Sequence, residues 1–307
     1  FGGNFNEDTM CKFGSMPLVR PQNVSEDSIT CLSPKVSSFG PHRVRLTNNM
    51  VDMSYDTKAF HFYDSLYINR IFPNSGPQRG GSKVLVSGIN FVNSKFLQCK
   101  FGDSTAIATW ISETKIECSS PKTSPGIYFV EVSNNGQQFS NNKRSFTVYP
   151  DVDIFEIGPQ TGTIVGGTLI TLYGHNFVEG PSLRCSFNGS DYSNAIYYNS
   201  SLIKCVTTPY KGDVGSQVDV RVSNNGRDYS LSKAEFHYEA ILEIITIFPT
   251  FGPSSGNTLV HVYGRNFVNS STFLCSFGNI TVKAKFVSKG KLRALVRLMY
   301  PVMALCF

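Results

Sequence analysis

Cysteine is the residue type whose spacing indicates chemistry most clearly in this chain. Six of the eight cysteines form three couples separated by 20, 19 and 20 residues: Cys11 with Cys31, Cys99 with Cys118, and Cys185 with Cys205. Such regular spacing favours three disulfides, each closing a loop of about 20 residues and worth roughly 3 kcal/mol in the chain-entropy treatment. Buried free thiols are the alternative, and zinc is disfavoured because no second Cys or His lies at ligand spacing. The couples therefore predict an oxidising compartment.

Asparagine provides a second indication of secretion. Five Asn-x-Ser/Thr sequons predict N-linked glycans, at Asn23, Asn188, Asn199, Asn269 and Asn279. A chain rich in Asn and Ser produces some sequons by chance, so their weight comes from agreement with the paired cysteines. Together the two patterns predict an extracellular protein, either secreted or at the cell surface. No cofactor other than these glycans is expected.

Residues suited to catalysis or metal binding are scarce. The chain has five histidines, and no pair of them lies at a ligand or catalytic spacing: His42, His61, His175, His237 and His261. No nucleophile elbow, zincin motif, phosphate loop or dinucleotide fingerprint is present. Acidic residues do not show the spacing of an EF-hand loop. We therefore predict a protein that is not an enzyme, with no catalytic residue and no metal site.

The cysteine couples belong to a repeat of about 88 residues. Cys11, Cys99, Cys185 and Cys275 are spaced by 88, 86 and 90 residues, and each opens a Cys-x-Phe phrase. This period fits a small β-sandwich domain better than a helical solenoid unit. The repeat predicts four domains: residues 1–64 without the first strands, complete repeats at 65–150 and 151–239, and an incomplete repeat at 240–307.

The second repeat shows how its strands must position the cysteines. Residues 67–72 and 106–111 predict strands, and Trp110 of the latter is expected to anchor the core. Val84 and Val86, and likewise Leu97, Cys99 and Phe101, alternate with the period of a half-buried strand. Asn134-Asn135-Gly136 predicts a type I′ hairpin turn. The predicted fold is all-β, a series of immunoglobulin-like antiparallel sandwiches.

The two ends of the chain depart from this pattern. The first repeat has Met50 where the others have Gly136 and Gly226, so its turn is expected to differ. In the fourth repeat Ala294 replaces the second cysteine, and the sequence from about residue 294 matches nothing in the other repeats. We expect a divergent tail without a final strand, and Cys275 without its normal partner. Cys306 is a weak substitute, and an amphipathic membrane-binding tail is the functional alternative.

Charge is unevenly distributed. The net charge is +6, and the chain from residue 280 onward carries six basic residues and no acidic one, leaving the remainder neutral. A nucleic-acid-binding protein is expected to have a basic face on its folded domains, and these repeats show no general excess. No apolar run is long enough to span a membrane. The chain opens inside a repeat, so we expect a piece of a longer protein.

The repeated phrases resemble the IPT/TIG domain, an immunoglobulin-like sandwich of the early-set type. The resemblance extends to about Arg293 and is carried by Pro73–Pro77, Gly80-Gly81, Gly88–Phe91, Cys99–Gly102, Cys118–Pro121 and Val132–Gly136. The version with paired cysteines is similar to tandem arrays on cell surfaces. The resemblance implies a structural, adhesive or receptor role, with membrane attachment only through a missing part of the chain.

We therefore expect a stiff, glycosylated rod that assembles with copies of itself into fibres, since identical repeats suit contacts that do not close. The main alternative is a receptor stalk that binds a cell-surface protein ligand. Two further alternatives are a nuclear DNA-binding module, which neutral repeats oppose, and a carbohydrate-binding accessory of a secreted enzyme, which requires rows of exposed aromatic residues. No nucleic-acid partner is expected.

Overall fold

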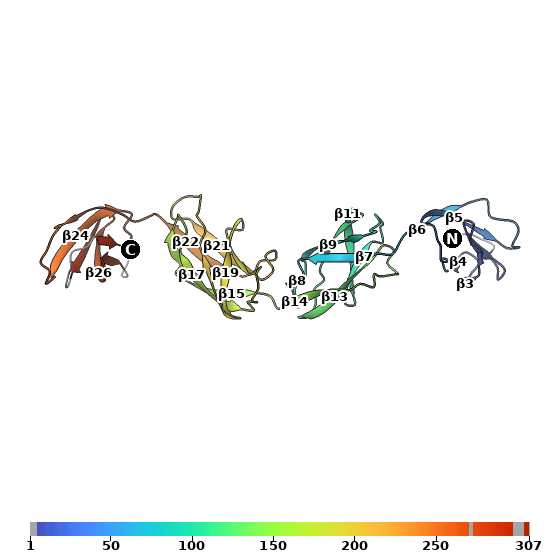
Figure 1. Cartoon of the computed structure of the whole chain (residues 1–307), viewed down its shortest axis with the longest axis horizontal. Coiled ribbons are helices and arrows are strands. Elements are labelled where there is room, and N and C mark those ends of the chain that lie inside the picture. Colours follow the sequence, from blue (N-terminus) through green and yellow to red (C-terminus); the bar gives the residue numbers. More distant parts are fainter. Residues whose placement is uncertain (1–4, 270–272, 297–303, 307) are drawn as a thin grey trace. The chain divides into compact units, whose positions relative to one another are not determined.

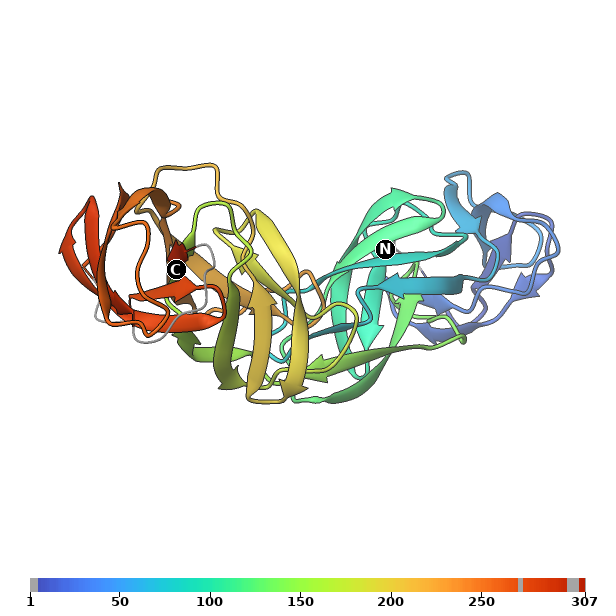
Figure 2. The same cartoon turned by 60° about the vertical axis from the view of Figure 1, so that its left-hand side comes forward.

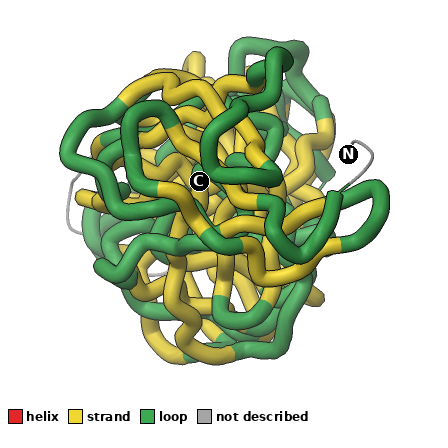
Figure 3. Tube along the Cα trace, turned by 90° about the vertical axis from the view of Figure 1, so that its right-hand side faces the viewer, coloured by secondary structure: helices red, strands yellow, loops and turns green. Residues whose placement is uncertain are grey.

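The computed structural model describes residues 5–269, 273–296 and 304–306, and these residues form strands and loops without a helix (Figures 1 and 3). The described residues accordingly provide no helix that is both long and apolar enough to cross a bilayer. The chain divides into two compact units, Phe1–Ser75 with Gly80–Thr147, and Gly76–Arg79 with Val148–Phe307. The all-β prediction is confirmed.

In the first repeat, six strands form a four-stranded sheet of order β2-β1-β5-β6 and a two-stranded sheet of β3 and β4. The strands are β1 (Met10–Phe13), β2 (Leu18–Val19), β3 (Pro21–Val24), β4 (Ile29–Cys31), β5 (Gly40–Thr47) and β6 (Lys58–Phe62). Cys11 and Phe13 of β1 are buried, whereas the alternate residue Lys12 is only partly buried. This period-two burial is what the sequence pattern predicts for a strand with one face on a core.

The second repeat has eight strands in the order β7-β9-β12-β11-β10-β13-β14-β8. They are β7 (Tyr67–Phe72), β8 (Ser75–Pro77), β9 (Lys83–Ile89), β10 (Gln98–Phe101), β11 (Ser104–Ser112), β12 (Lys115–Ser119), β13 (Gly126–Ser133) and β14 (Arg144–Tyr149). The long strand β11 pairs with β10 through its first half and with β12 through its second half, with a register shift between Trp110 and Ser112. One strand therefore belongs to both layers of the sandwich.

The third repeat follows the same order, β15-β17-β20-β19-β18-β21-β22-β16. Its strands lie side by side with loops at both ends, in yellow-green to gold in Figure 2. They are β15 (Asp153–Gly158), β16 (Thr161–Thr163), β17 (Leu169–His175), β18 (Arg184–Phe187), β19 (Asp191–Asn199), β20 (Leu202–Val206), β21 (Gln217–Ser223) and β22 (Ala234–Glu239). The short strand β16 pairs with β22 in parallel, which departs from the purely antiparallel prediction.

The fourth repeat has the strand order β23-β24-β27-β26-β25-β28, which matches the first six positions of the complete repeats. Its strands are β23 (Glu243–Phe248), β24 (Thr258–Arg265), β25 (Leu274–Phe277), β26 (Ile280–Ser288), β27 (Lys291–Val296) and β28 (Ala304–Cys306). Strand β27 continues through residue 294, and Ala294, which stands in the place of the second cysteine, is fully buried. The divergence of the tail from about residue 294 stays a prediction. The strand β28 pairs with β25 as β13 pairs with β10, and Cys275 is disulfide-bonded although its normal partner position holds Ala294. Cys306 is the backbone partner of Cys275 in that pairing.

The core of each complete repeat consists of aliphatic and aromatic residues from both layers. Val84, Val86 and Ile116 have no exposed surface, and Phe146 is 1% exposed. Trp110, predicted as the core anchor, is instead partly buried, and its indole N–H donates to the backbone oxygen of Phe91 at 3.2 Å. Its position next to the register shift in β11 places the ring at the margin of the core. The centre of the core is packed by aliphatic residues together with phenylalanines such as Phe91 and Phe146.

Candidate binding pocket and its framework

The three cysteine couples form disulfides inside their own repeats. Cys11 bonds to Cys31, Cys99 to Cys118 and Cys185 to Cys205, with Cα–Cα distances of 6.4, 6.3 and 6.3 Å. In the complete repeats the bonds join β10 to β12 and β18 to β20, and all four cysteines are at most 1% exposed. Each bond connects strands that lie on either side of β11 or β19 in the sheet order. The disulfides therefore tie together the framework that supports any site on these repeats.

The Gly-x-Asn-Phe phrase forms a tether at the start of each repeat. Asn90, Asn176 and Asn266 have left-handed φ angles of 64°, 66° and 64°. Their amides donate at 2.8 Å to the backbone oxygens of Ser65, Asp151 and Ile241, which lie at the beginning of the second, third and fourth repeats. Gly88 is required because a Cβ there would lie 2.2 Å from the backbone oxygen of Tyr67.

The Asn-Asn-Gly phrase has a different structure from the predicted type I′ turn. Only Gly136 is left-handed, with φ 76°, and a loop follows until β14 begins at residue 144. The amide of Asn134, 2% exposed, accepts from the Val92 N–H at 3.0 Å and donates to the Asn90 oxygen at 2.8 Å. Asn224 makes the same pair of bonds in the third repeat. These first asparagines are occupied inside the fold, which leaves them no role in surface recognition.

The first repeat keeps this turn despite its different residue. Met50 has φ 64°, close to the 76° and 73° of Gly136 and Gly226. Asn49 accepts from the backbone N–H groups of Val51 and Asp52, as Asn135 does from Gln137 and Gln138. The expectation that this turn differs is therefore wrong. A methionine in the left-handed region costs about 1–2 kcal/mol, and the asparagine hydrogen bonds hold the turn in place.

The predicted glycosylation positions are all accessible. The five sequon asparagines lie in exposed positions: Asn23, Asn188, Asn199, Asn269 and Asn279. Asn188 and Asn279 occupy matching places, between β18 and β19 and between β25 and β26. Accessibility is what an oligosaccharide requires, and occupancy stays a prediction.

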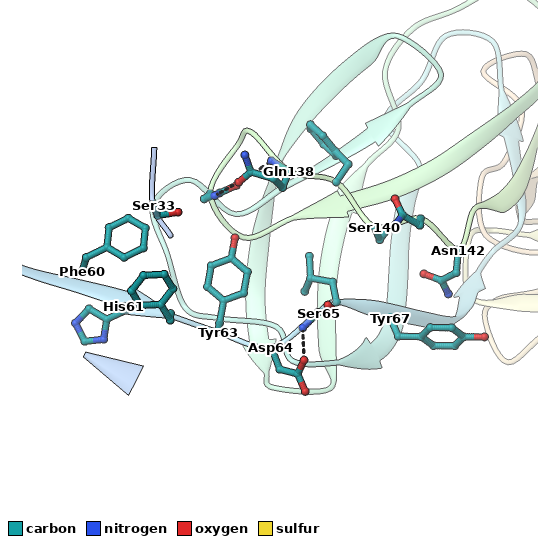
Figure 4. A pocket seen from close by; sticks show the side chains of 15 residues that line it. Ser33, Phe60, His61, Tyr63, Asp64, Ser65, Tyr67, Gln138, Ser140 and Asn142 are labelled. Atoms are coloured by element: carbon teal, nitrogen blue, oxygen red, sulfur yellow. Dashed lines mark hydrogen bonds between the residues drawn. The ribbon is translucent and has the colours of Figure 1, made fainter. Parts of the chain in front are cut away.

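One pocket lies in the first unit, between the end of β6 and the loop after β13, and has a volume of about 710 Å³ (Figure 4). Its walls combine aromatic rings with amides: Phe60, Phe62, Tyr63, Tyr67 and Phe139 with Asn135, Gln138, Asn141 and Asn142. Figure 4 shows the Tyr63 ring pointing toward the segment that carries Gln138. Burial raises the pKa of the Tyr63 hydroxyl, so the group is neutral at physiological pH.

Hydrogen bonds hold the pocket wall formed by the loop after β13. Ser140 accepts from the Val132 N–H through its hydroxyl at 3.1 Å, and its own N–H donates to the Val132 oxygen. Asn142 binds both backbone groups of Ile68, and Asn135 donates to the Gln138 amide oxygen at 2.6 Å. A preformed wall of rings and amides suits contact with a peptide or another neutral polar group.

The pocket offers little catalytic chemistry. His61 and Asp64 are its ionisable side chains besides tyrosines, both are exposed, and the Asp64 carboxylate accepts from the Ser65 N–H. Among residues 5–269, 273–296 and 304–306, no cluster of three His, Cys, Asp or Glu side chains is arranged to bind a metal. Sequence reasoning did not find this pocket, because its two walls come from different repeats. His61 and the Asn-Asn-Gly phrase were the residues that could have indicated it.

Fold, disulfides and repeated turns together define a tandem array of immunoglobulin-like sandwiches. The IPT/TIG domain model matches residues 1–62, 66–148, 154–238 and 242–299, and the chain therefore belongs to the IPT/TIG family. Human fibrocystin-L is 27% identical over 252 residues, covering 80% of this chain and 6% of that protein. Plexin-2 of Caenorhabditis briggsae is 26% identical over 269 residues, covering 85% of this chain and 15% of that protein.

Solved structures that the chain is similar to include the full extracellular region of plexin A4. That structure has 15% sequence identity, covers 96% of this chain and 32% of its own, and gives a TM-score of 0.42. Invasin, a bacterial integrin-binding protein, has 10% identity, covers 97% of this chain and 70% of its own, with a TM-score of 0.27. The chain thus spans a small part of the plexin and fibrocystin relatives.

Proposed function

We propose that this chain is a non-enzymatic segment of an extracellular protein, in which successive IPT/TIG repeats form a stalk and expose surface to a protein ligand. The observation that carries the proposal is the set of buried disulfides repeated inside consecutive sandwiches. Such bonds persist in oxidising compartments and are rare in the cytosol. The relationship to plexin-2 and fibrocystin-L supports a stalk or receptor region.

The pocket between β6 and the loop after β13 is the proposed contact surface for that ligand. Its aromatic rings provide apolar area at low entropic cost, and its amides can pair with backbone groups of a peptide. The wall formed by Ser140 and Asn142 is held by hydrogen bonds to β13 and β7, so little ordering is required on binding.

The test of the location is the redox state of the native protein. Denaturation without reduction, followed by thiol alkylation and mass spectrometry, should leave Cys99, Cys118, Cys185 and Cys205 unlabelled, and prior reduction should label all four. Antibody staining of intact cells or of the medium should detect the protein. Alkylated cysteines without reduction, or staining only after permeabilisation, would contradict the proposal.

Self-assembly into fibres is the second proposed activity. Repeats of one fold present similar surfaces, and heterologous contacts between them build open filaments when the rotation does not close. Exposed apolar residues on the second repeat, such as Ile107 at 82% and Ile127 at 70% exposure, offer contact area. Electron microscopy of native extracts should show filaments with a regular axial repeat. Single particles at all concentrations would refute assembly and leave the stalk.

A further inference from the structure

The basic residues near the end of the sequence gather on one face of the fourth repeat. The side chains of Leu292 and Ala294 on β27 and Ala284 on β26 are buried, so the alternate residues of both strands face outward. These outward positions hold Lys283, Lys285, Lys291 and Arg293, which we call the cationic face. Lys283, Lys285 and Arg293 are exposed, and the Lys291 ammonium lies 5.0 Å from the centre of the Tyr263 ring.

The register brings these cations close together. Arg293 is the direct partner of Lys285 on one side and of His261 on the other, so one row across β24, β27 and β26 holds three basic side chains. Directly opposed like charges destabilise a sheet. Within the described part of the chain, no carboxylate lies at ion-pair distance from any of the four cations, and the nearby Glu243 pairs with Arg265.

The other repeats show that the fold does not need these cations. The corresponding row is Leu85, Glu117 and Thr109 in the second repeat, and Glu117 forms an ion pair with Lys83 at 3.5 Å. In the third repeat the row is Thr171, Lys204 and Ile196. The position of Lys283 is taken by Ile107 in the second repeat and by Asn194 in the third. Each of these residues pairs with the first residue of the neighbouring strand, β25, β10 or β18. The fold of a repeat therefore does not require the like charges of Lys285 and Arg293.

We infer that the cationic face binds a sulfated polysaccharide. A linear polyanion can neutralise several cations in neighbouring rows at once, and the repulsion between Lys285 and Arg293 becomes attraction to a shared sulfate group. The choice of a polysaccharide rests on the proposed extracellular location, where sulfated glycans are the abundant linear polyanions. The cationic face itself, and its ability to bind a polyanion, do not depend on that location.

The first test uses purified full chain and a size-defined heparin oligosaccharide, measured by calorimetry at low and at physiological ionic strength. The variant Arg293→Glu/Lys285→Thr introduces the residues of the second repeat and lowers the charge by three. We expect affinity to fall at least tenfold. The control Lys95→Ala/Lys122→Ala/Lys143→Ala removes the same charge from exposed positions of the second repeat, and its affinity should change less than twofold.

Three results would overturn the inference. The first is no heparin binding, or an equal loss in the control variant. The second is equally tight binding of a DNA duplex of matched charge with the same response to Arg293→Glu, which would indicate a surface for any polyanion. The third is inorganic sulfate that, at equal sulfate concentration, competes as well as the oligosaccharide, because the site would then be one for a single small anion.

A gain-of-function variant tests the inference without altering the fourth repeat, whose variants could lose binding through misfolding. Ile107→Lys/Thr109→Lys/Glu117→Arg, together with the native Lys115, builds the four-cation arrangement on the second repeat. The inference predicts that the number of oligosaccharides bound per chain rises from one to two. An unchanged stoichiometry would refute the claim that this arrangement is sufficient. Failure here leaves the thiol-labelling result untouched, so the two proposals fail separately.

Discussion

Replacing Asn134 with alanine should destabilise the second repeat alone. The Asn134 amide is 2% exposed and makes two hydrogen bonds, at 3.0 Å from the Val92 N–H and at 2.8 Å to the Asn90 oxygen. Each such bond contributes about 0.5–1.5 kcal/mol, and each buried group left unpaired costs about 1–3 kcal/mol. Val92 is near the surface and can recover water, so we expect a total loss of about 2–3 kcal/mol.

Hydrogen exchange of the intact chain measures this loss repeat by repeat. The slowest amides of β9 and β12, such as those of Val86 and Ile116, report opening of the second repeat. A loss of about 2–3 kcal/mol predicts roughly 30- to 150-fold faster exchange there. Amides of the third repeat, such as that of Ile203, should not change. Asn224→Ala should reverse the pattern between the two repeats.

A matched control is Asn135→Ala. Its side chain accepts from two N–H groups of a partly exposed turn and donates to the exposed Gln138 side chain. Water can replace these bonds, so we expect about 1 kcal/mol or less. Less than threefold faster exchange in Asn134→Ala, or equal acceleration in both repeats, would refute the assignment of Asn134 as a structural link. It would also reopen a surface role for Asn134.

Further predictions concern the turn, the disulfide, the glycans and alkaline pH. Met50→Gly should stabilise the first repeat by about 0.5–1 kcal/mol, because glycine accepts the left-handed φ; slower exchange in β5 checks this. Cys99→Ala/Cys118→Ala should cost the second repeat about 3 kcal/mol, seen as a lower-melting calorimetric transition. Peptide N-glycosidase should convert the occupied sequon asparagines of the native protein to aspartate, and no mass shift at any of the five would refute glycosylation. Burial, then Asp228, raises the pKa of Tyr149 above its usual range. Above about pH 10 the hydroxyl ionises in the unfolded chain before it ionises in the folded one, so the folded state loses stability as pH rises further. Tyr149→Phe should weaken this alkaline destabilisation in a pH series of melting curves.

Local sequence patterns predicted the strands well because burial in a sandwich alternates with period two. The strand predicted at 67–72 is β7, and the buried faces of β9 and β10 follow the predicted alternation. Features that depend on distant backbone could not be predicted from local patterns. Gly88 is determined by the oxygen of Tyr67 on a neighbouring strand, and the Asn134 amide by a loop more than 40 residues earlier.

The candidate site was less predictable than the fold. The pocket requires residues from two repeats, and no single-repeat pattern contains both walls. The cationic face was visible as a cluster in the sequence, yet only the strand register shows that Arg293 stands between His261 and Lys285. Ala294 was interpreted as a break in the repeat, whereas the structure uses it as a small core residue of β27.

The disulfides also limit how far the chain can lengthen under tension. Cys99 and Cys118 are 19 residues apart in sequence and 6.3 Å apart in space. A fully extended residue spans about 3.3–3.6 Å, so each bond withholds roughly 60 Å of extension when a pulled sandwich unravels. The withheld segment contains all of β11, the strand shared by both layers. Reduction under load would therefore release extensions of nearly equal length from three repeats. The redox state of the surroundings would then determine how far the chain extends under a given force.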